Sequence, residues 1–248
     1  MSDMDILPRL REQKQRRLKG GLYHQTQILL CYNSNRIEGS RLSEEQTRLI
    51  FETAMLHAEN GESLRVDDII EAANHFAAFD YLLNVADQPL SEKIIKNFHA
   101  ILKRGTTGAG KDWFRVGGYK RLPNMVGSRE TTAPHRVNKE MRELLAAYHG
   151  KTEINFTDIV DFHYRFEVIH PFQDGNGRVG RLVAFKECLN HAIIPFIINE
   201  EHKIFYYRGL ERYPDESGWL MDTCRSSQDR YAAMIEYFYP TTANGSQS

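Results

Sequence analysis

Residues 170–181 read His-Pro-Phe-Gln-Asp-Gly-Asn-Gly-Arg-Val-Gly-Arg. Pro171 disfavours helical backbone at the residue before it and cannot continue an approaching helix. Apolar residues at helical spacing resume with Val179, so a second helix should begin at about residues 175–177. The stretch is therefore predicted to be a turn between two helices, with His170 at the end of the first.

The start of the second helix suits a phosphate group. Gly175 and Gly177 allow close approach to the backbone, and the N–H groups of a first helical turn attract anions. Asp174 is placed to hold Mg²⁺, which prefers one or two carboxylates together with phosphate oxygens. Arg178 and Arg181 share one helical face, where both can bind phosphate oxygens. Taken singly, each residue also fits an ordinary capped helix junction with exposed arginines.

Every specified position matches the pattern His-Pro-Phe-x-Asp/Glu-Gly-Asn-Gly-Arg-x-x-Arg, so the chain resembles the Fic family. The resemblance implies an all-α fold, namely a compact Fic-type helical bundle with a short β-hairpin flap. It also implies an enzyme that transfers AMP from ATP to a Ser, Thr or Tyr hydroxyl of a protein. In that reaction His170 would deprotonate the hydroxyl, and Phe172 would anchor the loop in the core.

The resemblance assigns the rest of the stretch to nucleotide binding. It places Asp174 on Mg²⁺, Gly175, Asn176 and Gly177 in an anion hole, and Arg178 and Arg181 on the β and γ phosphates. Such a transfer depends on positioning and charge neutralisation more than on covalent help from the protein. A histidine suits the role of base, because its ordinary pKa of about 6.5 leaves it mostly neutral at cellular pH.

A second signature lies upstream, where residues 34–39 read Ser-Asn-Arg-Ile-Glu-Gly. They fit the inhibitory pattern Ser/Thr-x-x-x-Glu-Gly/Asn of the Fic family, with Ser34 and Glu38 at its specified positions. The resemblance implies that Glu38 pairs with Arg181 and removes the guanidinium that should hold the γ-phosphate. The alternative is an ordinary helix end, with Glu38 in the last turn and Gly39 as its cap.

Between the two signatures, Gly and Pro residues interrupt the helical rhythm at residues 117–128. Residues 119–126 can form a short hairpin. The resemblance implies that this segment is a flap whose edge, at Met125, Val126 and Gly127, binds the target protein by strand addition. A plain surface connection between helices is the alternative.

Two other patterns are interpreted as structural. Residues 105–111 resemble a phosphate-binding loop, but Asp112 stands where Ser or Thr should bind the metal, which indicates a plain loop. His163, Glu167 and His170 fall on one helical stripe, yet their order is not that of a zinc hydrolase. His163 is therefore expected to be a packed or partly exposed residue.

A Tyr-Tyr-x-x-Leu segment follows the motif helix at residues 206–210. In Fic proteins such a segment helps to enclose the adenine, so the resemblance makes Tyr206 a candidate base-contacting residue. Packing at the rim of the core is the alternative for two adjacent tyrosines on a helix.

Helical spacing, caps and stops predict helices at residues 22–37, 43–58, 66–86, 91–104, 137–149, 157–169, 176–191, 203–212 and 217–238. Residues 1–20 are rich in charge and are expected to form a loosely held N-terminal segment. Residues 21–238 are predicted to be one Fic domain, with an inhibitory helix (about 22–39), a flap (about 117–128) and the catalytic motif (170–181). The tail, 239–248, is expected to be disordered.

The composition limits which binding partners and which cellular location are expected. The chain of 248 residues has a formal net charge of −1, so no strong field recruits nucleic acid or a membrane surface. Its three cysteines, Cys31, Cys188 and Cys224, lie on predicted helices without metal-binding spacing, which indicates reduced, buried thiols. Without a secretion signal or an apolar run of membrane-spanning length, the expected location is the cytoplasm.

The expected cofactor is Mg²⁺, and the expected partners are ATP and a hydroxyl-bearing protein target, which includes the chain itself. A symmetric homodimer is one option, because closed dimers are the commonest assembly. Removal of AMP from a modified protein, or transfer of another nucleotide, uses the same residues and stays open. A non-enzymatic helical module that binds nucleotide is the alternative from another class.

Overall fold

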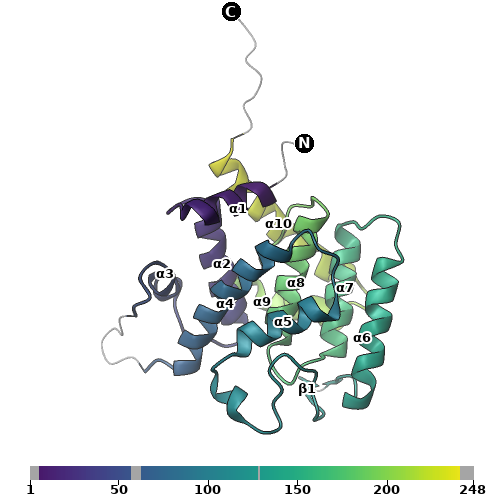
Figure 1. Ribbon diagram of the computed structural model, residues 1–248. Helices are drawn as coiled ribbons and strands as arrows, with labels where there is room; N and C mark the ends of the chain where they lie inside the picture. Colours follow the sequence, from purple (N-terminus) through teal and green to yellow (C-terminus); the bar gives the residue numbers. More distant parts are fainter. Residues whose placement is uncertain (1–5, 57–62, 128, 241–248) are drawn as a thin grey trace, which may run out of the picture.

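The computed structural model describes residues 6–56, 63–127 and 129–240 (Figure 1). The elements of these residues follow in chain order: α1 (Leu7–Arg16), α2 (Leu22–Ile37), α3 (Glu44–Thr53), α4 (Val66–Val85), α5 (Glu92–Lys103), η1 (Thr107–Gly110), β1 (Met125–Val126), β2 (Arg129–Glu130), α6 (Pro134–His149), α7 (Phe156–Ile169), α8 (Asn176–Asn190), η2 (Glu200–His202), α9 (Lys203–Arg212) and α10 (Gly218–Phe238). The predicted all-α class with one small hairpin is confirmed.

Helix α8 lies in the middle of the bundle (Figure 1). All of its residues from Asn176 to Leu189 are buried, because α2, α4, α5 and α7 pack around it. The helix therefore has no polar outer face, and its charged side chains must find partners inside the protein. This placement puts the motif arginines in the interior.

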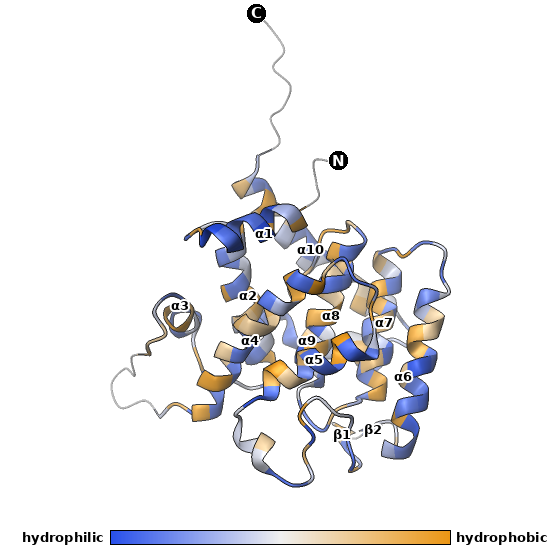
Figure 2. Ribbon diagram, in the orientation of Figure 1, coloured by the Kyte–Doolittle hydropathy of each residue, from blue (hydrophilic) through white to orange (hydrophobic). Residues whose placement is uncertain are grey.

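The main core joins α7 and α8 to α4 and α5 through large apolar side chains. Its fully buried aromatic residues are Phe79, Phe98, Phe166, Phe172 and Phe185. Figure 2 shows apolar segments on the central helices, whereas α1 at the edge of the molecule is mostly hydrophilic.

The predicted caps of two helices are present. The Ser43 side chain accepts from the backbone N–H of Gln46, whose own side chain accepts from the Ser43 N–H, and Ser91 caps α5. Helix α3 ends at Thr53, earlier than predicted, because Ala54 adopts a left-handed backbone with φ of 55°. Residues 57 and 58 of the predicted helix lie outside the described residues. Helix α6 begins three residues earlier than predicted, since Pro134 starts its first turn.

The N-terminal segment differs from the expectation of a loosely held chain. Residues 7–16 form α1, which buries Leu7 and Leu10 in the main core. The Arg11 guanidinium donates to the Leu83 carbonyl oxygen at 2.9 Å and pairs with Asp87 at 3.1 Å. Residues 1–5, and residues 241–248 of the predicted disordered tail, lie outside the described residues.

Other predictions can be compared with the structure directly. Cys31, Cys188 and Cys224 are buried free thiols, as predicted. Residues 105–111 form a loop with the single turn η1, whose Thr107 hydroxyl donates to Asp67 at 2.5 Å. In the described parts of the chain, every helix is too short or too polar to cross a membrane.

Candidate active site

His170 ends α7 with a left-handed backbone, φ 50° and ψ 60°. Its N–H donates to the Phe166 carbonyl oxygen at 2.9 Å, and Pro171 stops the helix there, as predicted. Burial lowers the pKa of His170 to about 4, and the nearby Lys120 ammonium adds to the shift. The imidazole is therefore neutral at pH 7 and able to accept a proton.

Phe172 anchors the loop after His170 in the core, as the resemblance implies. The Phe172 ring is fully buried and stacks on His99, with ring centroids 4.0 Å apart and planes at 3°. The Asn176 side chain then closes the loop, because it accepts from the Phe172 N–H (2.7 Å) and donates to the Phe172 carbonyl oxygen (2.9 Å). Any contribution of Asn176 to an anion hole must therefore come from its backbone N–H.

The start of α8 has the backbone features of the predicted anion cradle, and its anion binding stays a prediction. Gly175 caps the helix with φ of 82°, a conformation that favours glycine. The first N–H groups of the helix have no carbonyl partner within it and favour a negative group nearby. A Cβ on Gly177 would lie 2.2 Å from Oε1 of Glu38, so only glycine leaves room for this carboxylate beside the helix start.

Glu38 and Arg181 are in contact, although 143 positions separate them in the sequence. Arg181 Nη2 lies 2.8 Å from Glu38 Oε1, and the same guanidinium donates to the Ser34 hydroxyl (3.0 Å) and carbonyl oxygen (2.9 Å). Burial alone would raise the pKa of Glu38, but Arg181 and Arg178 outweigh it and hold the pKa below its ordinary value. Glu38 is therefore ionised at neutral pH. Nη1 of Arg181 is buried without a hydrogen-bond partner among the described residues.

Asp174 stands at the mouth of this cradle with a side chain 53% exposed. Burial by itself would raise the pKa of Asp174. The positive charges of Arg178 and Lys103 outweigh this effect and lower the pKa to about 2. The described residues contain no group of three or more His, Cys, Asp or Glu side chains that could hold a metal alone. A single exposed carboxylate beside a phosphate cradle fits Mg²⁺, which takes few protein ligands when phosphate oxygens and water supply the others.

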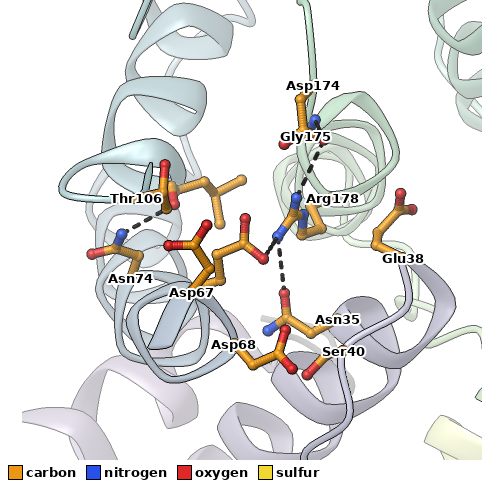
Figure 3. Close-up of polar contacts among 12 residues, drawn as sticks. Asn35, Glu38, Ser40, Asp67, Asp68, Asn74, Thr106, Asp174, Gly175 and Arg178 are labelled. Carbon is orange, nitrogen blue, oxygen red and sulfur yellow. Dashed lines mark hydrogen bonds and ion pairs between the residues drawn. The ribbon is translucent and has the colours of Figure 1, made fainter. Parts of the chain in front are cut away.

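Arg178 lies in the interior rather than beside solvent. Figure 3 shows it between Asp174 and Asn35. Its Nη1 lies 2.5 Å from Glu71 Oε2 and 3.5 Å from the Asn35 side-chain oxygen. Glu71 also accepts from Lys103, whose Nζ lies 2.6 Å from Asp174 Oδ2. In this conformation Arg178 is therefore engaged by carboxylates of the protein itself.

In the stripe of His163, Glu167 and His170, the first residue is buried and the other two are partly buried. His163 Nε2 lies 2.7 Å from the Tyr206 hydroxyl, so His163 is a packed residue, one of the two options that the sequence leaves open. Burial raises the pKa of Glu167 to about 8, which favours its neutral form at pH 7. Tyr206 is 1% exposed, and the Arg181 guanidinium lies 5.9 Å from its ring centre. The role of Tyr206 in base binding stays a prediction.

The flap hairpin lies later in the sequence than predicted. It pairs Met125 with Glu130 and Val126 with Arg129, instead of forming within residues 119–126. Gly127 lies in its turn with φ of 59°. The side chains of Met125 and Val126 are 59% and 43% exposed.

Hydrogen bonds tie the base of the flap to the motif loop. The Lys120 N–H donates to the Pro171 carbonyl oxygen at 2.9 Å, and the Asn124 amide donates to that of Phe172 at 3.0 Å. The flap edge is thus held at a set position relative to His170.

Glu71 and Lys103 are site residues that the sequence did not reveal. Each lies on a helix of ordinary composition, and no motif surrounds either one. The one feature of the sequence that points to them is a charged residue among the apolar positions of α4 and α5, and this is a weak indication of a site.

Residues 89–187 match the Fic/DOC family. The chain is 29% identical over 187 residues to the protein adenylyltransferase Fic of Aedes aegypti, covering 73% of this chain and 36% of that protein. It is 25% identical over 195 residues to the protein adenylyltransferase fic-1 of Caenorhabditis elegans, covering 76% and 37%. The chain thus spans little more than a third of these curated relatives.

Solved structures share the fold at low sequence identity. A Fic domain containing signalling protein from Bacteroides thetaiotaomicron aligns with a TM-score of 0.70 and 23% identity, covering 93% of this chain and 90% of that one. A fragment of Caenorhabditis elegans Fic-1 aligns with a TM-score of 0.70 and 20% identity, covering 94% and 71%.

Proposed function

Because residues 89–187 match the Fic/DOC family, we propose that the chain transfers AMP from ATP to a Ser, Thr or Tyr hydroxyl of a protein. One observation carries the proposal: a neutral imidazole at His170 shares a single loop with Asp174 and the open start of α8. A base, a carboxylate for a metal and a phosphate cradle are what this reaction requires.

The reaction assigns a task to each part. The target hydroxyl oxygen bonds to the α-phosphorus, the bond from that phosphorus to the bridging oxygen of the β-phosphate breaks, and pyrophosphate leaves. The hydroxyl proton moves to the free ring nitrogen of His170. The N–H groups at the start of α8 and the Arg181 guanidinium hold the phosphates in line. Asp174 would hold Mg²⁺, which when bound supplies further positive charge to the phosphates.

We further propose that Glu38 restrains this activity. Its carboxylate lies beside the start of α8 and is 2.8 Å from Arg181, so it competes with phosphate for both. Ser34 supports the same arrangement, because its hydroxyl and carbonyl oxygens accept from Arg181. The contact therefore occupies the Arg181 nitrogen Nη2, which is then no longer available to a γ-phosphate.

The test is labelling with α-³²P-ATP and Mg²⁺ in the parent and in Glu38→Gly. We expect Glu38→Gly to label itself or lysate proteins at least about tenfold faster, which corresponds to about 1.4 kcal/mol of barrier. Adding His170→Ala to that variant should abolish the labelling. Equal labelling in the parent and Glu38→Gly would refute the restraint, and labelling that survives His170→Ala would refute the assigned base.

Removal of AMP is a second candidate, favoured by the ionised state of Glu38 beside the cradle. In that reaction the carboxylate would orient a water molecule towards the phosphorus. Labelled Glu38→Gly protein offers the substrate for its test. Release of labelled AMP by added parent protein, but not by added Glu38→Gly, would support removal.

A further inference from the structure

Asp174 is gripped from the protein side by two buried cations. Lys103 Nζ lies 2.6 Å from its Oδ2, and Arg178 Nη2 lies 3.6 Å from its Oδ1. The Lys103 and Arg178 side chains are each 4% exposed, whereas that of Asp174 is 53% exposed. One side of the carboxylate is therefore held by the interior while the other side faces outward.

Glu71 lies behind these cations and binds both. Its Oε1 is 2.5 Å from Lys103 Nζ, and its Oε2 is 2.5 Å from Arg178 Nη1. The three residues come from α4, α5 and α8, so a single carboxylate joins three helices at this point. With a side chain only 14% exposed, Glu71 is shielded from solvent that would otherwise loosen the contacts.

The four charged side chains of this group carry no net charge. Two cations and two carboxylates alternate in the order Glu71, Lys103, Asp174 and Arg178, with Arg178 returning to Glu71. Removing one member leaves a buried charge without its partner, which is far more costly than the net value of the intact pair. A side chain in such a closed ring has little freedom to rotate.

We propose that Glu71 and Lys103 are positioning residues for the carboxylate of Asp174 in metal binding. The inference rests on the proposed function, in which Asp174 holds Mg²⁺. Carboxylates that bind metals are themselves usually held by hydrogen bonds, and loss of such a support costs roughly 10–100-fold in metal affinity or activity. Lys103 supports Asp174 directly, and Glu71 sets the position of Lys103 and of Arg178.

The experiment compares Lys103→Met and Glu71→Gln in the Glu38→Gly background, where the cradle is open. Mg²⁺ is titrated calorimetrically in the presence of a non-hydrolysable ATP analogue, and the Mg²⁺ dependence of AMP transfer is measured in parallel. We expect both variants to need at least about tenfold more Mg²⁺ for half-saturation. The rate at saturating Mg²⁺ should change much less, because the reacting groups remain.

Controls separate positioning from general damage. Lys103→Arg should restore part of the metal affinity, since it keeps the charge. Lys93→Met removes an exposed lysine from the same helix and should leave the titration unchanged. If Lys103→Met fails to fold, the isosteric Glu71→Gln decides the outcome.

Mg²⁺ titrations that match the Glu38→Gly background in both variants would overturn the inference. This result is distinct from failure of the proposed function. If Glu38→Gly transfers no AMP but the Mg²⁺ titrations still shift, the proposed function fails and the positioning role stands. If transfer occurs and the Mg²⁺ titrations do not shift, the proposed function stands and the positioning role fails.

Discussion

The surroundings of His170, rather than its residue type, set its protonation state. Burial disfavours the charged ring, and the Lys120 ammonium acts in the same direction. An ordinary histidine would be partly protonated just below neutral pH. This one stays neutral well below that range, so the unprotonated ring that a base requires is present at neutral pH.

The pH dependence of transfer tests this point. Because a base acts only when deprotonated, a pKa lowered to about 4 extends the active range towards acid. We expect kcat/KM of Glu38→Gly to stay level from about pH 8 to about pH 5 and to decline as the pH approaches 4. Rates are measured with α-³²P-ATP at saturating Mg²⁺. An inflection near pH 6.5 would contradict the lowered pKa.

At the scale of elements, the site is the meeting point of the end of α2 with the start of α8. Glu38 caps α2, and its carboxylate passes over Gly177 to reach Arg181. The contact between Glu38 and Arg181 thus requires glycine at position 177 as well as the two charged residues. This geometry predicts that release does not require a change in either charged residue.

Gly177→Ala should weaken the contact between Glu38 and Arg181. The new Cβ would lie 2.2 Å from Glu38 Oε1, and a flexible carboxylate moves more readily than the buried helix. We expect self-labelling to be faster than in the parent but slower than in Glu38→Gly, because the methyl group also lies in the phosphate cradle, 2.9 Å from Arg181 Nη1. Adding Gly177→Ala to Glu38→Gly should therefore slow that variant. The melting temperature of Gly177→Ala is measured alongside, so that a loss of stability is recognised separately from release of the contact.

Gly218→Ala is the matched control, because a Cβ at the first residue of α10 meets nothing within 4 Å. It should label at the parent rate. Parent-like labelling by Gly177→Ala as well would show that the contact tolerates the methyl group.

At the scale of the whole molecule, the first and last helices of the described chain are in contact. The Gln13 amide of α1 donates to the Tyr239 hydroxyl at 2.5 Å, and Figure 1 shows α1 beside the end of α10. The hydroxyls of Thr26 in α2 and Tyr231 in α10 are 2.9 Å apart. Helix α2, which leads to Glu38, is therefore held between the terminal helices and the core.

Leu10→Ala tests whether α1 is an integral part of this arrangement. Leu10 is fully buried in the main core, so its truncation should lower the free energy of unfolding by about 2–5 kcal/mol. Leu18→Ala, at a leucine 44% exposed, is the matched control and should cost far less. Urea denaturation of both variants provides the measurement. A loss below about 1 kcal/mol for Leu10→Ala would indicate a loosely attached α1.

Helix positions, caps and the turn at His170 could be predicted because they depend on neighbours in the sequence. Pro171 and the glycines act within a few residues, and Ser43 needs only Gln46 to form its cap. The hairpin lies later than the glycine and proline pattern predicts, since both its strands have only two residues and little local signal. The packing of α1 is not evident from the sequence, because two buried leucines stand among many charged residues.

The order of chemical groups in residues 170–181 was determined by the sequence alone, because twelve adjacent positions and local backbone rules suffice for it. The resemblance to the Fic family also predicts the pairing of Glu38 with Arg181. Only the tertiary structure decided that Arg178 is buried against Glu71 and that Lys103 supports Asp174. Lys103 lies 32 positions from Glu71 and 71 from Asp174, and such contacts exist only where α4, α5 and α8 pack together and exclude water.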